Sequence, residues 1–336
     1  MTSTRAVEAP YLIFLGDAQN DIAAKTGAGI AQWRPGRCIG QHRLPACKVD
    51  IGLAEMTIAE AVSAGARTFV IGVVNAGGIL PDTWLPAIAE ALEQGLDVAS
   101  GMHMRLADNP GLAALAERHG RRLIDLRVPE GPFTTGSGDK RAGKRLLTVG
   151  TDCAVGKKYT ALALVDGMRA RGMNATFRAT GQTGILIDGT GIPMDAVKSD
   201  FVAGAAEALS PENHPDHWDV VEGQGSLLHP SYAGVTLGLL HGSQPDRFVV
   251  CHEPTRTTML GVNTPIAAIE DIIRLTTELG ALTNPAIRCV GISVNTVKLP
   301  ENEARALLDA LSARHGLPAT DPVRFGVAPI LEELTR

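Results

Sequence analysis

The chain has 336 residues, 45% of them hydrophobic and 20% charged, which is enough for two ordinary domains with sizeable cores. Its formal net charge of −5 gives no bulk attraction to nucleic acid or to an anionic membrane, so we expect neither as a partner. The five cysteines show no CxxC or Cys/His metal spacing, and no apolar run reads as a membrane span or a secretory segment. We therefore expect a cytoplasmic protein with reduced thiols and no bound metal.

The first part of the chain alternates predicted strands with predicted amphipathic helices. The strands are expected at 11–16, 68–74 and 96–100, and the helices at 57–65, within 81–95 and at 110–120. The stretch between the first two strands reads as a long connection rather than as a simple crossover helix. This alternation predicts a parallel sheet with helices on both faces. We assign residues 1–128 to a Rossmann-like α/β domain.

A polar segment, "PEGPFTTGSGDKRAGK" at 129–144, is the best linker candidate because it is rich in Gly, Ser, Thr and Lys. Residues 145–336 again alternate in an α/β pattern. The strands expected there are "RLLTVG", "NATFRAT", "WDVVEGQ", "RFVVCHEP" and "IRCVGISVNT", and the later helices are expected at 194–209, 265–280 and 301–315. We predict a second domain, similar to the P-loop NTPases.

The stretch "VGTDCAVGKKYT", residues 149–160, carries the clearest chemical signal. It follows an apolar strand and opens a helix, and the backbone N–H groups of such a loop bind anionic oxygen. A GxxxxGK[ST] loop places a hydroxyl directly after its lysine as a Mg²⁺ ligand, but here Lys158 stands at that position. The predicted phosphate-binding residues are Gly150, Thr151, Asp152, Cys153, Ala154, Val155, Gly156, Lys157, Lys158 and Tyr159.

Two further strand ends carry polar side chains. Glu222 ends the strand "WDVVE" and precedes a Gly-rich turn, and "FRATGQTGILIDG" places Arg178 and Gln182 at the end of another strand. Ligands of open α/β sheets bind at the carboxyl ends of the strands. We therefore expect the glycine loop and these two segments to converge on one edge of the sheet.

These motifs resemble known families. GTDCAVGK is similar to the loop of dethiobiotin synthetase, and VEGQGS resembles the acidic-glycine turn of that family. The combination of GTDCAVGKKYTA, AVKSDFVAGAAE and EGQGSLLHP more specifically resembles a family of two-domain bacterial P-loop proteins whose assigned members are D-glutamate N-acetyltransferases. KTGAGI, NAGG and GMHMRLAD extend that resemblance to the first domain. It implies acetyl-CoA as the cosubstrate and D-glutamate as the acceptor.

Lys158, the second cation of the loop, helps to distinguish acetyl-CoA from ATP as the cosubstrate. Dethiobiotin synthetase has Thr where this chain has Lys158, and losing that hydroxyl weakens the case for Mg²⁺-dependent ATP hydrolysis. A cation there suits coenzyme A, which presents a pyrophosphate and a further phosphate. Because Thr160 could still reach an ion, an ATP- and Mg²⁺-dependent ligase or kinase stays open as the alternative. A nucleotide-binding regulator without catalysis is a third.

Acetyl transfer to an amine requires a deprotonated amine and a donor for the developing oxyanion. Glu222 is the first candidate for the base and His229 the second, and Lys198 joins the catalytic candidates because it interrupts a helical pattern of small residues. Cys153 has no obvious base beside it, so we favour direct transfer over an acyl-enzyme. The substrate-binding candidates are Arg178, Gln182, Ser226 and Arg256.

We also expect a homo-oligomer. The chain has many Ala-rich helices, and the long connection of its first domain has few apolar residues to pack alone.

Overall fold

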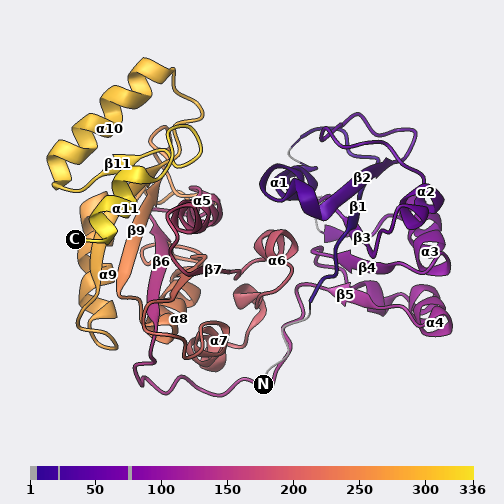
Figure 1. Ribbon diagram of the computed structural model, residues 1–336, viewed down its shortest axis with the longest axis horizontal. Coiled ribbons are helices and arrows are strands. Elements are labelled where there is room, and N and C mark those ends of the chain that lie inside the picture. The colour runs from indigo at the N-terminus through magenta and orange to yellow at the C-terminus, as the bar shows by residue number, and fades with distance from the viewer. Residues whose placement is uncertain (1–5, 22, 75–77) are drawn as a thin grey trace. The chain divides into compact units, whose positions relative to one another are not determined.

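The computed structural model describes residues 6–21, 23–74 and 78–336, so the NAGG stretch lies partly outside the described residues. The chain forms two compact units. The first holds the chain up to Glu130 together with Gln182–Ala196, and the second holds Gly131–Gly181 and Val197–Arg336. Each unit is built on one parallel sheet with helices on it (Figure 1), which confirms the predicted α/β class. Among the described residues, no helix combines the length and apolarity that a membrane span requires.

The first unit contains a five-stranded parallel sheet in the order β2-β1-β3-β4-β5. Its strands are β1 (Tyr11–Gly16), β2 (Cys38–Arg43), β3 (Thr68–Ile71), β4 (Asp97–Ser100) and β5 (Leu123–Asp125). Its helices include α1 (Lys25–Trp33), α2 (Ile58–Ser63), α3 (Leu85–Glu93) and α4 (Pro110–His119). Every residue of β1 is buried, as expected of a strand that is covered on both faces.

The long connection after β1 contains regular structure that the sequence analysis did not predict. It holds both α1 and β2, so it is indeed more than a simple crossover helix, but neither element was predicted. The helix escaped notice because it carries glycines, which are poor helix formers. Gly27 is required by packing, since a Cβ there would lie 2.9 Å from Cγ2 of Ile13. The strand escaped notice because it is a polar edge strand, "CIGQHR".

A segment from the middle of the chain belongs to the first unit. Helix α6 (Gln182–Asp188) packs beside α1, and the carbonyl of Gly189 accepts a hydrogen bond of 2.8 Å from the backbone N–H of Val7. Asp195 forms an ion pair of 2.7 Å with Arg127. The chain therefore leaves the second unit after residue 181 and rejoins it at residue 197.

The second unit contains a six-stranded parallel sheet in the order β11-β10-β9-β6-β8-β7. Its strands are β6 (Lys144–Gly150), β7 (Ala175–Arg178), β8 (Trp218–Val221), β9 (Arg247–His252), β10 (Arg288–Val294) and β11 (Ala319–Thr320). Its α-helices include α5 (Lys157–Ala170), α7 (Val202–Leu209), α8 (Ala233–Ser243), α9 (Ile269–Gly280), α10 (Glu301–His315) and α11 (Ala328–Leu334). Helix α5 packs beside α11, whereas α7, α8 and α9 form a separate row (Figure 1).

Three helices of the second unit differ from the expectation, and one of them, α11, was not predicted. The helix predicted at 194–209 is continuous only from Val202, because Lys198 has an extended backbone (ψ 138°) between two short 3-10 turns, η5 (Met194–Ala196) and η6 (Ser199–Phe201). Helix α8 was not predicted, since its glycines remove any amphipathic pattern. They allow close packing on α7: a Cβ at Gly242 would lie 2.1 Å from the carbonyl oxygen of Ala203.

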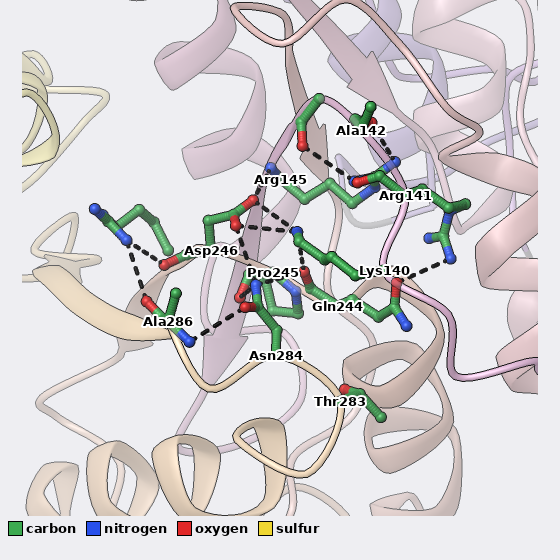
Figure 2. A network of polar contacts seen from close by, with 12 residues as sticks. Lys140, Arg141, Ala142, Arg145, Gln244, Pro245, Asp246, Thr283, Asn284 and Ala286 are labelled. Carbon is green, nitrogen blue, oxygen red and sulfur yellow. Dashed lines mark hydrogen bonds and ion pairs between the residues drawn. The ribbon is translucent and has the colours of Figure 1, made fainter.

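Residues 137–145, within and just after the predicted linker, are fixed to the second unit by polar contacts, and Figure 2 shows those made by Lys140, Arg141 and Arg145. Arg145 is fully buried and donates hydrogen bonds to backbone carbonyls that include those of Ser210 and Pro211. Lys140 forms an ion pair of 3.0 Å with Asp246, which also accepts from the backbone N–H of Arg145. The composition of this segment predicts a linker between the domains, and its cations find carbonyl and carboxylate partners at the start of β6.

Candidate active site

The glycine loop lies where the sequence predicts it, between the end of β6 at Gly150 and the start of α5 at Lys157. Two of its residues have positive φ, Ala154 (53°) and Gly156 (106°). The second of these is the N-cap of α5, so the loop leads directly into the N-terminus of a helix, where the helix dipole favours an anion. The loop therefore has the backbone form of an anion-binding site.

The side chains of the loop divide between its interior and its surface. Thr151 and Asp152 are fully buried, and Lys157 is 7% exposed. The Lys157 ammonium donates to the carbonyl oxygen of Asp152 at 2.8 Å, and burial lowers the pKa of this lysine. An anion bound in the loop would favour its charged form. Lys158 lies over the ring of Tyr159 with its Nζ 4.5 Å from the ring centroid.

The hydroxyl of Thr160, which the sequence left as a possible ion ligand, is turned into the protein. Thr160 is buried, donates to the carbonyl of Gly156 at 3.1 Å and lies 2.7 Å from the hydroxyl of Ser293. Its hydroxyl therefore lies between α5 and β10 rather than at the surface of the loop.

Asp152 holds the tip of the loop in place. Its carboxylate accepts from the backbone N–H of Leu260 at 2.8 Å and forms an ion pair with Arg256. Arg256 also donates to the carbonyl of Cys153 at 2.6 Å. The guanidinium proposed for substrate binding is thus engaged with the loop itself, and it fixes the loop's shape from the connection that follows β9.

Glu222 follows β8, the strand adjacent to β6, and its side chain is buried. One carboxylate oxygen accepts from the backbone N–H of Thr180 at 2.9 Å and of Gly181 at 3.3 Å. Burial raises the pKa of Glu222, although the neighbouring Lys158 and these N–H donors act against the rise. Gly223 lets the turn approach β6, because a Cβ there would overlap the carbonyl oxygen of Thr148. The loop, Glu222 and the end of β7 therefore meet at one edge.

His229 lies in the same region, but both of its ring nitrogens are engaged. Its Nδ1 accepts from the backbone N–H of Ser231 at 3.1 Å, so the proton resides on Nε2. Nε2 is 3.1 Å from the carbonyl oxygen of Leu260 and 3.7 Å from a carboxylate oxygen of Asp152. The imidazole is 1% exposed, and this arrangement favours holding the loop over accepting a substrate proton.

The side chains of the other predicted residues lie in different surroundings. Arg178 pairs at 2.8 Å with Asp219, near the opposite end of β8, and Lys198 is exposed between two 3-10 turns. Gln182 begins α6, which is part of the first unit. Ser226 is buried in the turn after Glu222, and its hydroxyl has no hydrogen-bond partner within the described ranges.

Among the described residues, one group of side chains brings three metal-ligand atoms close together. Asp152, Cys153 and His229 each bring a ligand atom within 4.8 Å of the others. The Asp152 carboxylate already accepts from Arg256 and Leu260, and the proton on His229 Nε2 faces a carbonyl. Burial raises the pKa of Cys153, which disfavours the thiolate that a metal would require. These atoms fit a hydrogen-bonded support better than a metal site.

Sequence reasoning missed the partners that orient the site. Leu260 lies far along the chain from Asp152 and contributes main-chain atoms, which carry no sequence signature. The N–H groups that bind Glu222 belong to Thr180 and Gly181, and only the glycine marks them. The polar run at the end of "FRATGQ" was the one available signal.

A strand, glycine loop and helix with a buried lysine, beside a carboxylate on the adjacent strand, define a P-loop protein of the parallel α/β class. The comparisons with known families agree. Residues 132–331 match the domain of unknown function DUF1611_C, described as a P-loop domain, and residues 41–129 match DUF1611_N, described as a Rossmann-like domain. This chain belongs to the DUF1611 family.

Relatives match the chain over nearly its whole length. It is 52% identical to a D-glutamate N-acetyltransferase of Tritonibacter scottomollicae and 47% identical to one of a Pseudoalteromonas species, covering 98% of this chain and 99% of each relative. A solved structure of a DUF1611 family protein from Anabaena variabilis superposes with a TM-score of 0.85 at 31% identity, covering 98% of this chain and 99% of that one. The family resemblance read from the motifs is confirmed.

Proposed function

We propose that this protein transfers the acetyl group of acetyl-CoA to the amine of D-glutamate and so forms N-acetyl-D-glutamate. The observation that carries the proposal is the likeness, over nearly the full length of both partners, to two proteins named D-glutamate N-acetyltransferase. The names supply the acceptor and the reaction. The choice of acetyl-CoA as the donor rests on the loop.

The chemistry of the loop favours a phosphate ligand bound without a metal. Its position at the N-terminus of α5 and the ammonium of Lys157 suit a pyrophosphate, and Lys158 stands where a metal-binding hydroxyl would be. Thr160, the next hydroxyl, is bonded within the protein. A ligand that brings phosphate and a thioester together fits this site, and coenzyme A thioesters have both.

In the proposed reaction the amine nitrogen of D-glutamate attacks the thioester carbonyl. The C–N bond forms, the C–S bond breaks, and the nitrogen loses a proton while the leaving thiolate gains one. We assign the proton transfer to Glu222, because its carboxylate lies beside the loop and burial raises its pKa, which makes it a stronger base than an exposed carboxylate. The N–H groups of Thr180 and Gly181 hold this carboxylate in one orientation.

The test is a thiol-release assay with purified protein, acetyl-CoA and a panel of L- and D-amino acids. We expect CoA release with D-glutamate, little with L-glutamate, and no loss of rate in EDTA. Formation of ADP from ATP that depends on the amino acid, without CoA release, would contradict the proposal and favour the ligase or kinase alternative.

The assembly and location of the protein are also proposals. We infer a cytoplasmic protein because its proposed substrates are small metabolites, and a homo-oligomer because the chain has many Ala-rich helices. Light scattering at micromolar concentration checks the assembly, and a mass near 35.3 kDa would contradict it.

A further inference from the structure

Three large apolar side chains are exposed to solvent around the tip of the glycine loop. They are Leu228, Tyr232 and Leu260, with exposures of 38%, 50% and 50%. We call these three residues the apolar rim. Single exposed apolar residues are ordinary in proteins, but three that are linked to one functional loop call for an explanation.

Hydrogen bonds and ring contacts tie the rim to the loop. The backbone N–H of Leu260 donates to Asp152 in the loop at 2.8 Å, and its carbonyl oxygen lies 3.1 Å from His229 Nε2. The ring of His229 in turn packs against that of Tyr232, with the centroids 4.7 Å apart. Leu228 directly precedes the histidine. The rim is therefore held in a fixed place relative to the phosphate-binding tip.

The topology places the rim on both sides of the loop. The loop follows β6, which lies between β9 and β8 in the sheet. Leu260 belongs to the connection after β9, whereas Leu228 and Tyr232 belong to the connection after β8. The second of these connections begins at Glu222, so the proposed base and part of the rim share one turn.

We propose that the apolar rim binds the pantetheine arm of the acyl-CoA whose pyrophosphate occupies the glycine loop; this inference rests on the proposed function. The arm is bonded directly to the pyrophosphate, so it must leave the loop beside the residues that border the loop. It carries a dimethyl-substituted carbon and methylene groups, which gain by covering exposed apolar side chains. His229 is then a positioning residue, which links Asp152, Leu260 and the ring of Tyr232.

The test compares a ligand that carries the acetylated pantetheine arm with one that lacks it. Calorimetry would measure the affinity of wild type and of Leu260→Ser for acetyl-CoA and for 3′-phospho-ADP, the part of coenzyme A without pantetheine. Both hydrogen bonds of Leu260 use main-chain atoms and remain in the variant. We expect acetyl-CoA to bind the variant about 3- to 10-fold more weakly, the effect of leaving half a leucine side chain uncovered, with 3′-phospho-ADP unchanged.

Two further variants test whether the effect is specific to the apolar rim. Tyr232→Ser should show the same selective loss for acetyl-CoA. Leu282→Ser removes a leucine that is 74% exposed in the connection after α9 and should change neither affinity. Circular dichroism would check that each variant is folded.

The possible outcomes distinguish a failure of the rim proposal from a failure of the proposed function. If wild type binds both ligands and the rim variants lose affinity for both equally, or for neither, the rim proposal is wrong while the CoA site stands. If wild type binds neither ligand, the acetyl-CoA proposal fails and the rim proposal fails with it. A lower mass in light scattering for Leu260→Ser, with unchanged affinity for acetyl-CoA, would assign the rim to a subunit contact and overturn the proposal.

Discussion

Strand β6 has a buried cation at each end, and the two cations have different surroundings. Arg145, near its start, donates to a group of backbone carbonyls and lies beside carboxylates in the network of Figure 2. Lys157, after its end, donates to one carbonyl, that of Asp152, among the contacts of the described residues. A buried polar group whose hydrogen-bond partners are all present stabilises the fold, whereas a buried group with unused donors can bind a ligand. The same strand thus joins a structural end to a functional one.

The largest effect should come from the functional end. Glu222→Gln keeps the shape of the side chain and removes the proton acceptor, so turnover should fall by about 10² to 10⁴. The affinity for acetyl-CoA should hardly change, because in a metal-free site the carboxylate does not hold the phosphates. Steady-state kinetics and calorimetry measure the two quantities, with Glu303→Gln on the exposed side of α10 as a control. Near wild-type turnover would remove Glu222 from catalysis.

The structural end should respond in stability rather than in rate. Arg145→Met retains most of the aliphatic bulk but leaves several buried carbonyls without a donor, and we expect a loss of about 3 kcal/mol or more in the free energy of unfolding by urea. Turnover per folded molecule should stay close to wild type. Arg305→Met, at an exposed arginine paired with Glu301, should cost less than about 1 kcal/mol. An equally small loss at Arg145 would contradict the contrast between the two ends.

Lys157→Ala should produce the opposite profile to the change at Arg145. Cofactor binding should weaken by about 1.5–3 kcal/mol, the range for a hydrogen bond to a charged group, with a smaller change in unfolding free energy than at Arg145. Calorimetry with acetyl-CoA measures the first quantity. Lys144→Ala, an exposed lysine at the start of β6, is the matched control and should leave affinity unchanged. An unchanged dissociation constant for Lys157→Ala would remove the loop from the site.

The smallest effect concerns pH. Because burial raises the pKa of Glu222, the folded protein holds this proton more tightly than the unfolded chain does. The bound proton stabilises the folded protein fully at pH values below the pKa of Glu222 in the unfolded chain. This stabilisation is lost as the pH rises through the pKa of Glu222 in the folded protein. The Glu222→Gln variant lacks this loss, so its Tm relative to wild type should be higher at pH 8 than at pH 5. A Tm difference that does not vary with pH would contradict the raised pKa.

The sequence predicted the structure best where a residue pattern has few structural alternatives. The glycine loop and the acidic end of "WDVVE" were both placed on the correct strands, because an apolar run followed by glycine has few alternatives. It was least informative where main-chain atoms or distant partners decide the outcome. Arg256 was predicted to bind substrate, and its contacts with Asp152 and a loop carbonyl were not predicted, because no local pattern reveals them. Helix α8 was missed because its glycines, which allow close packing on α7, leave no helical spacing of apolar residues in the sequence.

The excursion of residues 182–196 into the first unit has a consequence for synthesis on the ribosome. Ile185, Leu186 and Ile187 of α6 are buried in that unit, yet they are translated after the strand and loop that begin the second unit. The first unit therefore cannot complete its packing when its own five strands have emerged, and must wait until β6, α5 and β7 have also been made. A chain cut after residue 130 would leave α1 without α6, so separately expressed halves should be prone to aggregation.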